Sequence, residues 1–377
     1  MKKLKIRIHQ FKTLFLLYTF KIISMIPYNK KYWIICERGY DARDNGYHFY
    51  KYMKENHPEQ KVYYIIDKNS ADYRKVKDDA VQYGSIKNYF LVSTAEKIIS
   101  THYATMLPKL DKNLFKLTNI SKKFYFLQHG IIKENLKSLY YENSPMKLFV
   151  CGAYPEYLYV KENFGYPENI VQYTGLPRYD KLQDTSKKNQ ILIMPTWRYY
   201  IKNKIQFFNS DYYKNWSKLL NDKDLQHYLE EKNLKLVFYQ HFEFQKYSNL
   251  FNIKNNNIII ASFHDYDVQR LLCDSSLLIT DYSSVYFDFS YMKKPVIYYQ
   301  FDQKEYHSKH YSEGYFNFKE DGFGPVLISY DEVIKNIKEY VQNDFHIEGN
   351  YIENINRFFK FRDFDNCKRV YDAIRER

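Results

Sequence analysis

The segment from Leu277 to Pro295 combines an apolar run with an aspartate and two adjacent serines. The run from Leu277 to Thr280 predicts a buried strand that ends at Asp281. A helix is expected directly afterwards, with Ser283 or Ser284 at its N-cap. Free backbone N–H groups and the positive end of the helix dipole would then face the strand terminus, which suits an anion such as phosphate. An ordinary N-cap after a core strand explains the same residues.

Two histidines also follow predicted strands. His129 comes after the apolar run 124–127 and precedes Gly130, which allows a ligand to approach the backbone closely. His241 comes after the run 235–239. Histidine can act as a general base near neutral pH. A single histidine at a strand end is more often structural, so neither position identifies a site by itself.

Hydroxyl and guanidinium groups lie at two further strand ends. Thr196 and Arg198 follow the strand predicted at 191–194, and Arg178 follows a Gly-x-Pro turn. A guanidinium can bind a phosphate through two parallel hydrogen bonds. Either arginine can equally be a salt-bridge partner on a loop, and we favour Arg198 over Arg178 as the functional one. Polar strand ends of this kind in both halves of the chain are typical of a cleft enzyme that handles phosphates.

Alternating strands and helices position these residues. The alternation predicts parallel sheets flanked by helices, an α/β fold, in two similar halves joined by the polar stretch 185–190. Ligands of such sheets bind at the carboxyl ends of the strands. The expected strands cover residues 32–36, 62–66, 97–100, 124–127, 148–151, 171–174, 191–194, 235–239, 258–261, 277–280 and 296–299, and the expected helices 44–56, 212–220, 268–273, 285–292, 331–343 and 351–375.

Composition indicates the charge of the partners and the use of the cysteines. The 377 residues carry a net charge of +13, from 57 Lys and Arg against 44 Asp and Glu, which favours anionic partners. The four cysteines are far apart and form no CxxC pair, so we expect neither a metal site nor a disulfide framework. The 42 tyrosines and 28 phenylalanines indicate no function as a group.

Residues 1–30 predict an amphipathic helix. No uncharged stretch here approaches the ~20 residues needed to span a bilayer. Apolar residues at helical spacing, surrounded by lysines and an arginine, indicate a helix lying on an anionic membrane surface. The alternative is that the stripe packs on the protein's own core. The stripe consists of Leu4, Ile8, Phe11, Phe15, Tyr18 and Ile22.

Taken together, these segments resemble the CDP-glycerol glycerophosphotransferases, the teichoic-acid primase and polymerase family that is also found in capsule synthesis. Two departures stand out. Gln128 replaces the Trp that is common before the His-Gly pair, and His241 lacks the usual Lys-x-His-Pro or Thr-His setting. The elements that carry the resemblance are Gln128-His129-Gly130, Gly175 to Asp180, Pro195 to Arg198, Ile279 to Asp288 and Gly324 to Val326.

The resemblance implies a GT-B-like pair of Rossmann-like domains with a cleft between them. Residues 31–185 would form the acceptor domain and residues 186–350 the CDP-polyol domain. Residues 351–377 would form a helix that crosses back onto the first domain. The protein would work at the cytoplasmic face of the membrane as a peripheral protein, without nucleic acid.

The implied reaction is transfer of a polyol phosphate from CDP-glycerol or CDP-ribitol to a lipid-linked or membrane-bound polymer, with release of CMP. His129 would accept the hydroxyl proton, while His241 and Arg198 would neutralise the diphosphate. We expect no obligatory cofactor, although a weak Mg²⁺ dependence is compatible with the reaction. The remaining predicted substrate-binding residues are Gly130, Arg178, Thr196, Asp281, Ser283, Ser284 and Asp288.

Two other functions fit parts of the sequence. A GT-B glycosyltransferase that uses a nucleotide-sugar in capsule or cell-wall synthesis would share the fold and the phosphate site. A basic nucleic-acid or anionic-surface binding protein would fit the net charge. Against the second, the sequence contains no RNP, zinc-finger or helix-turn-helix signature.

Overall fold

The computed structural model describes residues 2–23, 31–110, 115–116, 118, 120–309 and 313–377. The chain divides into two compact units. The first comprises residues 1–131, 136–181 and 359–377, and the second comprises 132–135 and 182–358. The change of unit after residue 181 lies close to the boundary predicted at 185.

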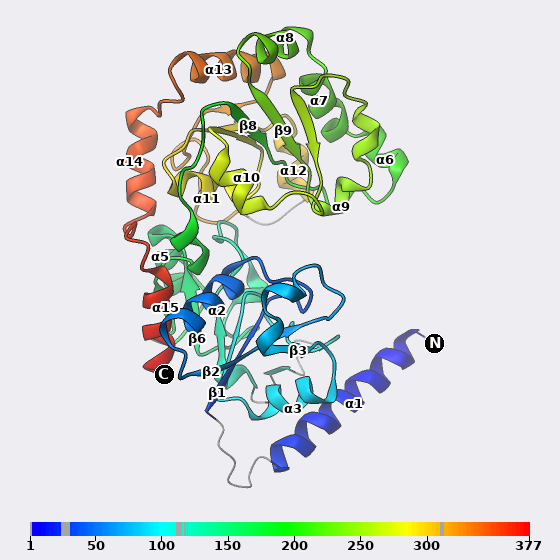
Figure 1. The fold of residues 1–377 in the computed structure, drawn as a ribbon, viewed down its shortest axis with the longest axis vertical. Helices are drawn as coiled ribbons and strands as arrows, with labels where there is room; N and C mark the ends of the chain where they lie inside the picture. The colour runs from blue at the N-terminus through cyan, green and yellow to red at the C-terminus, as the bar shows by residue number, and fades with distance from the viewer. Residues whose placement is uncertain (1, 24–30, 111–114, 117, 119, 310–312) are drawn as a thin grey trace. The chain divides into compact units, whose positions relative to one another are not determined.

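The first unit is built on a parallel sheet of seven strands in the order β3-β2-β1-β4-β5-β6-β7 (Figure 1). The order reverses between β1 and β4, the switch point where ligands bind in Rossmann-like sheets. The strands are β1 (Tyr32–Cys36), β2 (Lys61–Ile66), β3 (Ala80–Gln82), β4 (Lys97–Ser100), β5 (Phe124–Phe126), β6 (Leu148–Cys151) and β7 (Val171–Tyr173). The helices are α1 (Lys2–Ile23), α2 (Asn45–Asn56), α3 (Ile86–Thr94), α5 (Tyr154–Asn163) and α15 (Asn366–Arg375).

The second unit repeats this plan with six parallel strands in the order β10-β9-β8-β11-β12-β13, and its switch point lies between β8 and β11. The strands are β8 (Gln190–Ile193), β9 (Lys235–Tyr239), β10 (Ile258–Ala261), β11 (Leu277–Thr280), β12 (Val296–Tyr299) and β13 (Val326–Leu327). The helices are α6 (Lys204–Asn209), α7 (Asp211–Leu220), α8 (Lys223–Glu231), α9 (Phe242–Gln245), α10 (Val268–Asp274), α11 (Val285–Tyr291), α12 (Gln303–Lys309), α13 (Tyr330–Gln342) and α14 (Gly349–Phe358).

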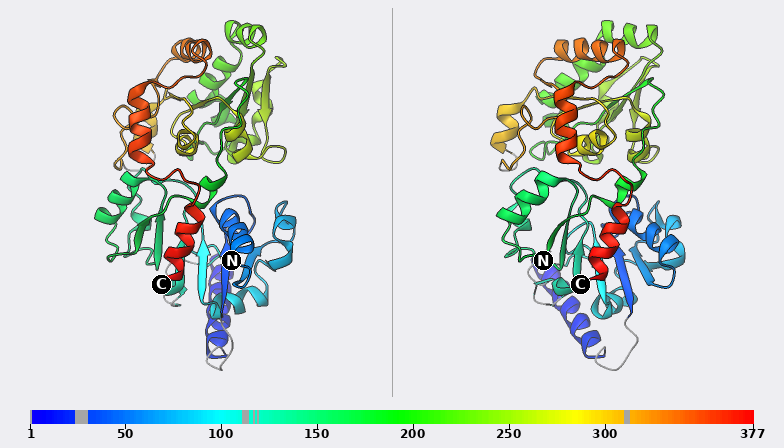
Figure 2. Two further views of the ribbon diagram at one scale, coloured as in Figure 1. Left: turned by 60° about the vertical axis from the view of Figure 1, so that its left-hand side comes forward. Right: turned by 90° about the vertical axis from the view of Figure 1, so that its left-hand side faces the viewer.

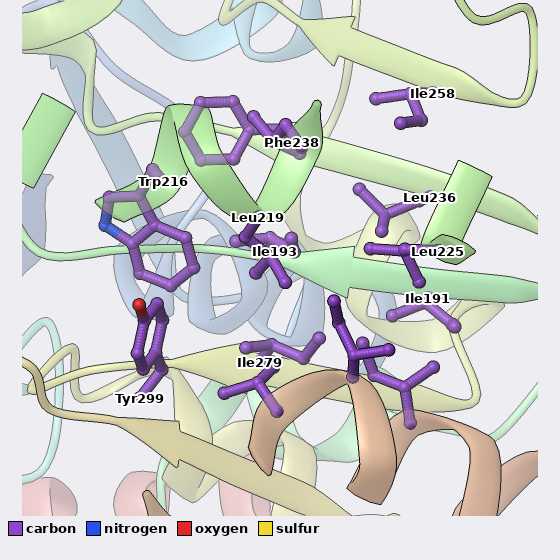
Figure 3. Close-up of a cluster of buried hydrophobic side chains, with 14 of the residues drawn as sticks. Ile191, Ile193, Trp216, Leu219, Leu225, Leu236, Phe238, Ile258, Ile279 and Tyr299 are labelled. Carbon is purple, nitrogen blue, oxygen red and sulfur yellow. The ribbon is translucent and has the colours of Figure 1, made fainter. Parts of the chain in front are cut away.

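A buried hydrophobic cluster fixes the sheet of the second unit (Figure 3). Alternate residues of the strands, including Ile191, Ile193 and Ile279, point to one face and meet the apolar sides of α7, α8 and α13. The fully buried Trp216 of α7 packs edge-on against Tyr299, with ring centroids 5.2 Å apart. Because strands of a parallel sheet are covered on both faces, such apolar runs identify them in the sequence.

Helix α1 packs on α3, but not through the predicted stripe. Thr13 and Leu17 are buried, and the ring of Phe20 meets that of Phe90 at 5.6 Å. The described members of the stripe face solvent instead: Phe11, Phe15, Tyr18 and Ile22 are 74%, 63%, 49% and 68% exposed. The alternative that these four side chains pack on the protein's own core is therefore wrong. The side chains of Leu4 and Ile8, like residues 24–30 of the predicted segment, lie outside the described residues.

The C-terminal segment differs from the single helix predicted at 351–375. It forms two helices, α14 in the second unit and α15 in the first. Helix α15 lies against β6 and α2 (Figure 2). Its start is fixed by Asp180, whose carboxylate accepts the backbone N–H groups of Asn366 and Cys367 at 2.8 Å each. Gly175 is needed beside it, because a side chain there would overlap Asn366 and the backbone φ is +76°.

Candidate functional site

His129 lies just beyond the carboxyl end of β5, in the first unit. Its side chain is exposed, whereas the preceding Gln128 is buried. Gln128 has φ of +59°, a left-handed conformation that is costly for a residue with a side chain. Its amide donates to the carbonyl of Val150 and to Glu156 Oε1, the latter at 3.1 Å. The neighbouring Gly130 has no left-handed backbone, so its predicted close approach to a ligand stays a prediction.

Asn45 clamps the strained turn before His129. This first residue of α2 is fully buried, and its amide donates to the carbonyls of Leu127 and Gln128 at 3.3 and 2.9 Å. Its side-chain oxygen accepts the backbone N–H of Arg178 at 3.1 Å. One side chain therefore ties the turn to α2 and to the segment after β7.

Arg178 completes this arrangement. Its guanidinium donates to Asp44 Oδ1 at 2.8 Å and to the carbonyl of His129 at 3.1 Å. Asp44 also caps α2, because its carboxylate accepts the backbone N–H of Asn45 at 2.7 Å. The predicted residue Arg178 thus lies beside His129, where it holds the backbone of the candidate base.

The imidazole of His129 stacks on that of His102, with ring centroids 4.3 Å apart and planes at 11°. Desolvation by the surrounding protein lowers the pKa of His129, and Arg178 acts in the same direction, whereas Asp44 and the Thr101 carbonyl oppose it. Burial, with the nearby His129 and Arg38, lowers the pKa of His102 to about 2. Both rings are therefore neutral at pH 7, and a neutral His129 can accept a proton.

Glu37 supports the same edge of the sheet from the end of β1. Its buried carboxylate accepts the backbone N–H groups of Arg43, Asp44 and Tyr47 at 3.2, 3.0 and 2.9 Å. Burial, followed by the charge of Asp44, raises the pKa of Glu37 to about 7. This carboxyl fixes the loop that presents Asp44 and Asn45.

In the second unit, the ends of β8 and β11 are joined directly at the switch point. The Thr280 hydroxyl donates to the Met194 carbonyl at 2.6 Å, and the Thr196 backbone N–H donates to Asp281 Oδ1 at 2.7 Å. The Thr196 hydroxyl is buried and finds no hydrogen-bond partner within the part of the chain that the structure describes. The predicted residues Thr196 and Asp281 are thus joined directly by a hydrogen bond.

Arg198 lies where no phosphate can reach it without a rearrangement. The residue is fully buried, and its guanidinium pairs with Asp302 at 2.7 Å and with Asp281 at 2.9 Å. A third contact runs to the Thr196 carbonyl at 2.6 Å. Removing one partner of a buried ion pair costs about 3–5 kcal/mol. Because its guanidinium is not exposed, Arg198 cannot make the predicted contact with phosphate in this conformation. We infer that Arg198 positions the loops after β8, β11 and β12.

The two serines remain available. Helix α11 begins after Ser284, which serves as its N-cap without a side-chain capping bond. Ser283 and Ser284 are partly exposed, and their hydroxyls make no hydrogen bond to any residue that the structure describes. The expected side-chain cap is thus absent from α11, which leaves both hydroxyls free for a ligand. Asp288 is buried one turn into the helix.

His241 begins α9 at the end of β9. Its Nδ1 accepts the backbone N–H of Glu243 at 3.4 Å, and its ring stacks on Trp197 at 5.4 Å between centroids. Trp197 lies between Thr196 and Arg198 in the sequence, so His241 belongs to the same edge of the sheet as these residues. Its catalytic role stays a prediction.

The partners of several residues in this arrangement were not predicted from the sequence, because they are far away along the chain. Asn45 and Gln128 are joined across more than eighty positions, and Arg198 and Asp302 across more than a hundred. The left-handed turn at Gln128 likewise gives no signal in the sequence. The sequence indicates Asp44 or Asn45 as the N-cap of the helix predicted at 44–56, and the structure shows that Asp44 is the N-cap.

Within the described ranges, no three His, Cys, Asp or Glu side chains are grouped so as to bind a metal ion. None of the helices described there has both the length and the apolar character needed to cross a bilayer.

Two parallel sheets of Rossmann-like order, each with chemically active residues at its strand ends, define a GT-B-like α/β protein. The comparison with solved structures agrees: the wall teichoic acid polymerase TagF superposes with a TM-score of 0.70 at 18% identity, covering 100% of this chain and 97% of that one. A UDP complex of S. aureus MnaA superposes less closely, with a TM-score of 0.56 at 12% identity, over 92% of this chain and 96% of that one.

The chain belongs to the CDP-glycerol:poly(glycerophosphate) glycerophosphotransferase family, whose model matches residues 16–376. The minor teichoic acid biosynthesis protein GgaB of Bacillus subtilis is 32% identical over 92% of this chain. The teichoic acid poly(glycerol phosphate) polymerase of the same organism is 24% identical over 94% of it. The chain spans 40% and 50% of the length of these two relatives.

Proposed function

We propose that the protein transfers glycerol phosphate, or another polyol phosphate, from a CDP-polyol to a teichoic-acid or capsular polymer and releases CMP. The observation that carries the proposal is the free pair of hydroxyls, Ser283 and Ser284, at the switch point of a sheet in a chain of this family. These hydroxyls and the first amides of α11 suit the diphosphate of the donor.

The reaction needs one proton acceptor and a site for two phosphates. An acceptor hydroxyl attacks the polyol-bearing phosphorus, the bond from that phosphorus to the CMP oxygen breaks, and CMP leaves. His129 takes the hydroxyl proton, which its neutral state at pH 7 permits. Ser283 and Ser284 hold the phosphate oxygens, and His241 adds a donor to the leaving group.

The decisive experiment is CMP release from CDP-glycerol and from CDP-ribitol, each with and without a membrane-derived acceptor. Acceptor-dependent CMP from one donor supports the proposal and identifies the polyol. A folded protein that is silent with both donors and an active acceptor contradicts it, and a nucleotide-sugar glycosyltransferase then becomes the better hypothesis. Addition of EDTA and then of Mg²⁺ to the same assay tests the expectation that no metal is obligatory.

We further propose that α1 holds the protein on the cytoplasmic face of the membrane, where a lipid-linked acceptor would be found. Support comes from the four exposed apolar side chains at positions 11, 15, 18 and 22 and from the absence of any acidic residue in the helix sequence. Burial of one phenylalanine in an apolar phase is worth roughly 1.5–3 kcal/mol. The sequence of α1 supplies lysines for anionic headgroups.

Sedimentation with phosphatidylglycerol vesicles tests this helix. The double variant Phe11→Ser and Phe15→Ser should bind such vesicles more than about tenfold more weakly than the wild type. Ile328→Ser is the matched control, because Ile328 is 64% exposed but lies in the second unit. Equal binding by all three proteins would contradict the membrane role.

A further inference from the structure

A cavity of about 380 Å³ lies in the second unit beside the end of β11, and the proposed reaction makes no use of it. Tyr282, which directly precedes the two serines, lines it together with Tyr306 of α12. Residues 313–319 and the pair Lys133 and Glu134 form further parts of the wall. The volume is within the range of about 300–1,000 Å³ that small-molecule sites occupy.

One wall of the cavity is aromatic and rigid. The rings of Tyr282 and Tyr306 stack face to face, with centroids 3.6 Å apart and planes at 9°. Phe318 meets Tyr282 edge-on at 6.0 Å, and the Tyr282 hydroxyl donates to Asp302 at 3.3 Å. The buried guanidinium of Arg198 lies 5.2 Å from the Tyr282 ring centroid. Both tyrosines are buried, with 2% and 7% of their surface exposed, so these contacts form a rigid apolar wall beside the cavity.

The polar groups of the cavity are equally fixed. Gln300 donates to the Asp281 carbonyl at 3.1 Å, and its own oxygen accepts the Gln303 amide at 3.1 Å. Lys133 is buried and paired with Glu134. Amides, carboxylates and the lysine ammonium groups offer both donors and acceptors, as hydroxyl groups require.

The lining residues carry no net charge, which disfavours a multiply charged anion. Two lysines, Lys133 and Lys319, are balanced by two glutamates, Glu134 and Glu313. A diphosphate would bring several negative charges into a site whose own charges cancel, whereas an uncharged ligand needs no compensation. The cavity therefore does not suit the diphosphate of the donor, although it adjoins Ser283.

We propose that this cavity binds an uncharged, hydroxyl-rich residue, a sugar or polyol unit of the acceptor polymer. The assignment to the acceptor rests on the proposed function; the ligand class rests on the cavity alone. Lys133 of the wall follows His129 by four positions in the chain.

Saturation-transfer NMR on the full chain tests the ligand class. The probes are methyl glucoside, N-acetylglucosamine, ribitol and glycerol, each without donor. Gln303 is partly exposed at the start of α12, so substitution there leaves the core intact. Gln303→Leu removes one amide and should weaken the best probe about 3- to 10-fold. Gln303→Trp should fill the cavity and abolish binding. Lys304→Leu, an exposed neighbour that does not line the cavity, should bind as the wild type does.

The affinity for CDP-glycerol, measured in parallel, separates the two proposals. Weaker probe binding by Gln303→Leu and abolished binding by Gln303→Trp, with unchanged CDP-glycerol affinity in both, support a separate acceptor subsite. If the probes fail to bind the wild type, or bind all variants equally, the inference is overturned. An equal loss of CDP-glycerol affinity also overturns it, because the cavity then belongs to the donor site. If CDP-glycerol never binds but the probes depend on Gln303, the proposed function fails while the sugar or polyol site stands.

Discussion

Asn45 is the residue whose removal tests the architecture around His129 most directly. The variant Asn45→Ala deletes three hydrogen bonds made by one fully buried side chain. The backbone N–H of Arg178 loses its acceptor, and the carbonyls of Leu127 and Gln128 lose a donor. A buried polar group left without a partner costs about 1–3 kcal/mol, so we expect the free energy of unfolding to fall by about 2–4 kcal/mol.

The same variant should affect catalysis through geometry. Gln128 keeps its left-handed conformation at a cost of about 1–3 kcal/mol, and the clamp by Asn45 opposes its relaxation. Once the clamp is lost, the turn before His129 can shift, and a displacement of about 1 Å can lower a rate by about 10²-fold. We expect kcat for CMP release to fall about 10- to 100-fold, while the Kd for CDP-glycerol changes little because the serine site lies in the other unit.

Urea unfolding and steady-state CMP release measure the two effects separately. Asn56→Ala is the control, because Asn56 ends the same helix and makes only an exposed hydrogen bond to the Tyr52 carbonyl at 3.1 Å. It should change stability by less than about 0.5 kcal/mol. If Asn45→Ala is destabilised but retains wild-type kcat per folded molecule, the clamp does not position His129. If its urea midpoint is unchanged, the hydrogen bonds contribute nothing.

Further predictions concern the base, the pH dependence and the buried ion pair. His129→Ala should lower turnover by about 10²–10⁴-fold while CDP-glycerol binding persists, and wild-type turnover would remove His129 from the mechanism. Because the pKa of His102 is lowered from 6.5 to about 2, the unfolded chain binds a proton that the folded chain does not. Stability is therefore complete above pH 6.5 and should fall by up to about 1.4 kcal/mol per unit below it, as measured by urea unfolding. His102→Asn should flatten this slope, and identical slopes would contradict the assignment. Arg198→Leu should lower the free energy of unfolding by about 3–5 kcal/mol, since it leaves Asp281 and Asp302 buried without a cation, and an unchanged unfolding midpoint would refute this account.

The sequence left two interpretations open both for the stripe of α1 and for Arg198. Phe11 and Phe15 could face a membrane or pack on the core, and they are exposed. Arg198 could bind a phosphate or a salt-bridge partner, and it is fully buried against two aspartates. In both cases the residue type fits either environment, and the neighbours that the fold supplies decide between them. For Arg198 those neighbours are two aspartates at the ends of other strands.

The sequence by itself determined the strands, their parallel arrangement in two halves and the positions of His129, Ser283 and Ser284 at strand ends. These features follow from apolar runs and turn residues, which are formed by residues that are neighbours in the sequence. Strands β3 and β13, of three and two residues, were not predicted; only Val81 of β3 is buried and both residues of β13 are partly exposed, so neither forms a buried apolar run. The helix predicted across 351–375 is interrupted because its two parts belong to different units.

Only the tertiary structure decided how each polar side chain is used. The clamp from Asn45 to Gln128, the pairing of Arg198 with Asp302 and the stacking of His102 on His129 all join residues from different strands or loops. Such contacts depend on strand order and on where each strand ends, and no local pattern records them. Packing therefore decides whether a charged or polar group contacts a substrate or a buried partner. A polar group left unpaired in the interior costs more free energy than local conformational preferences supply.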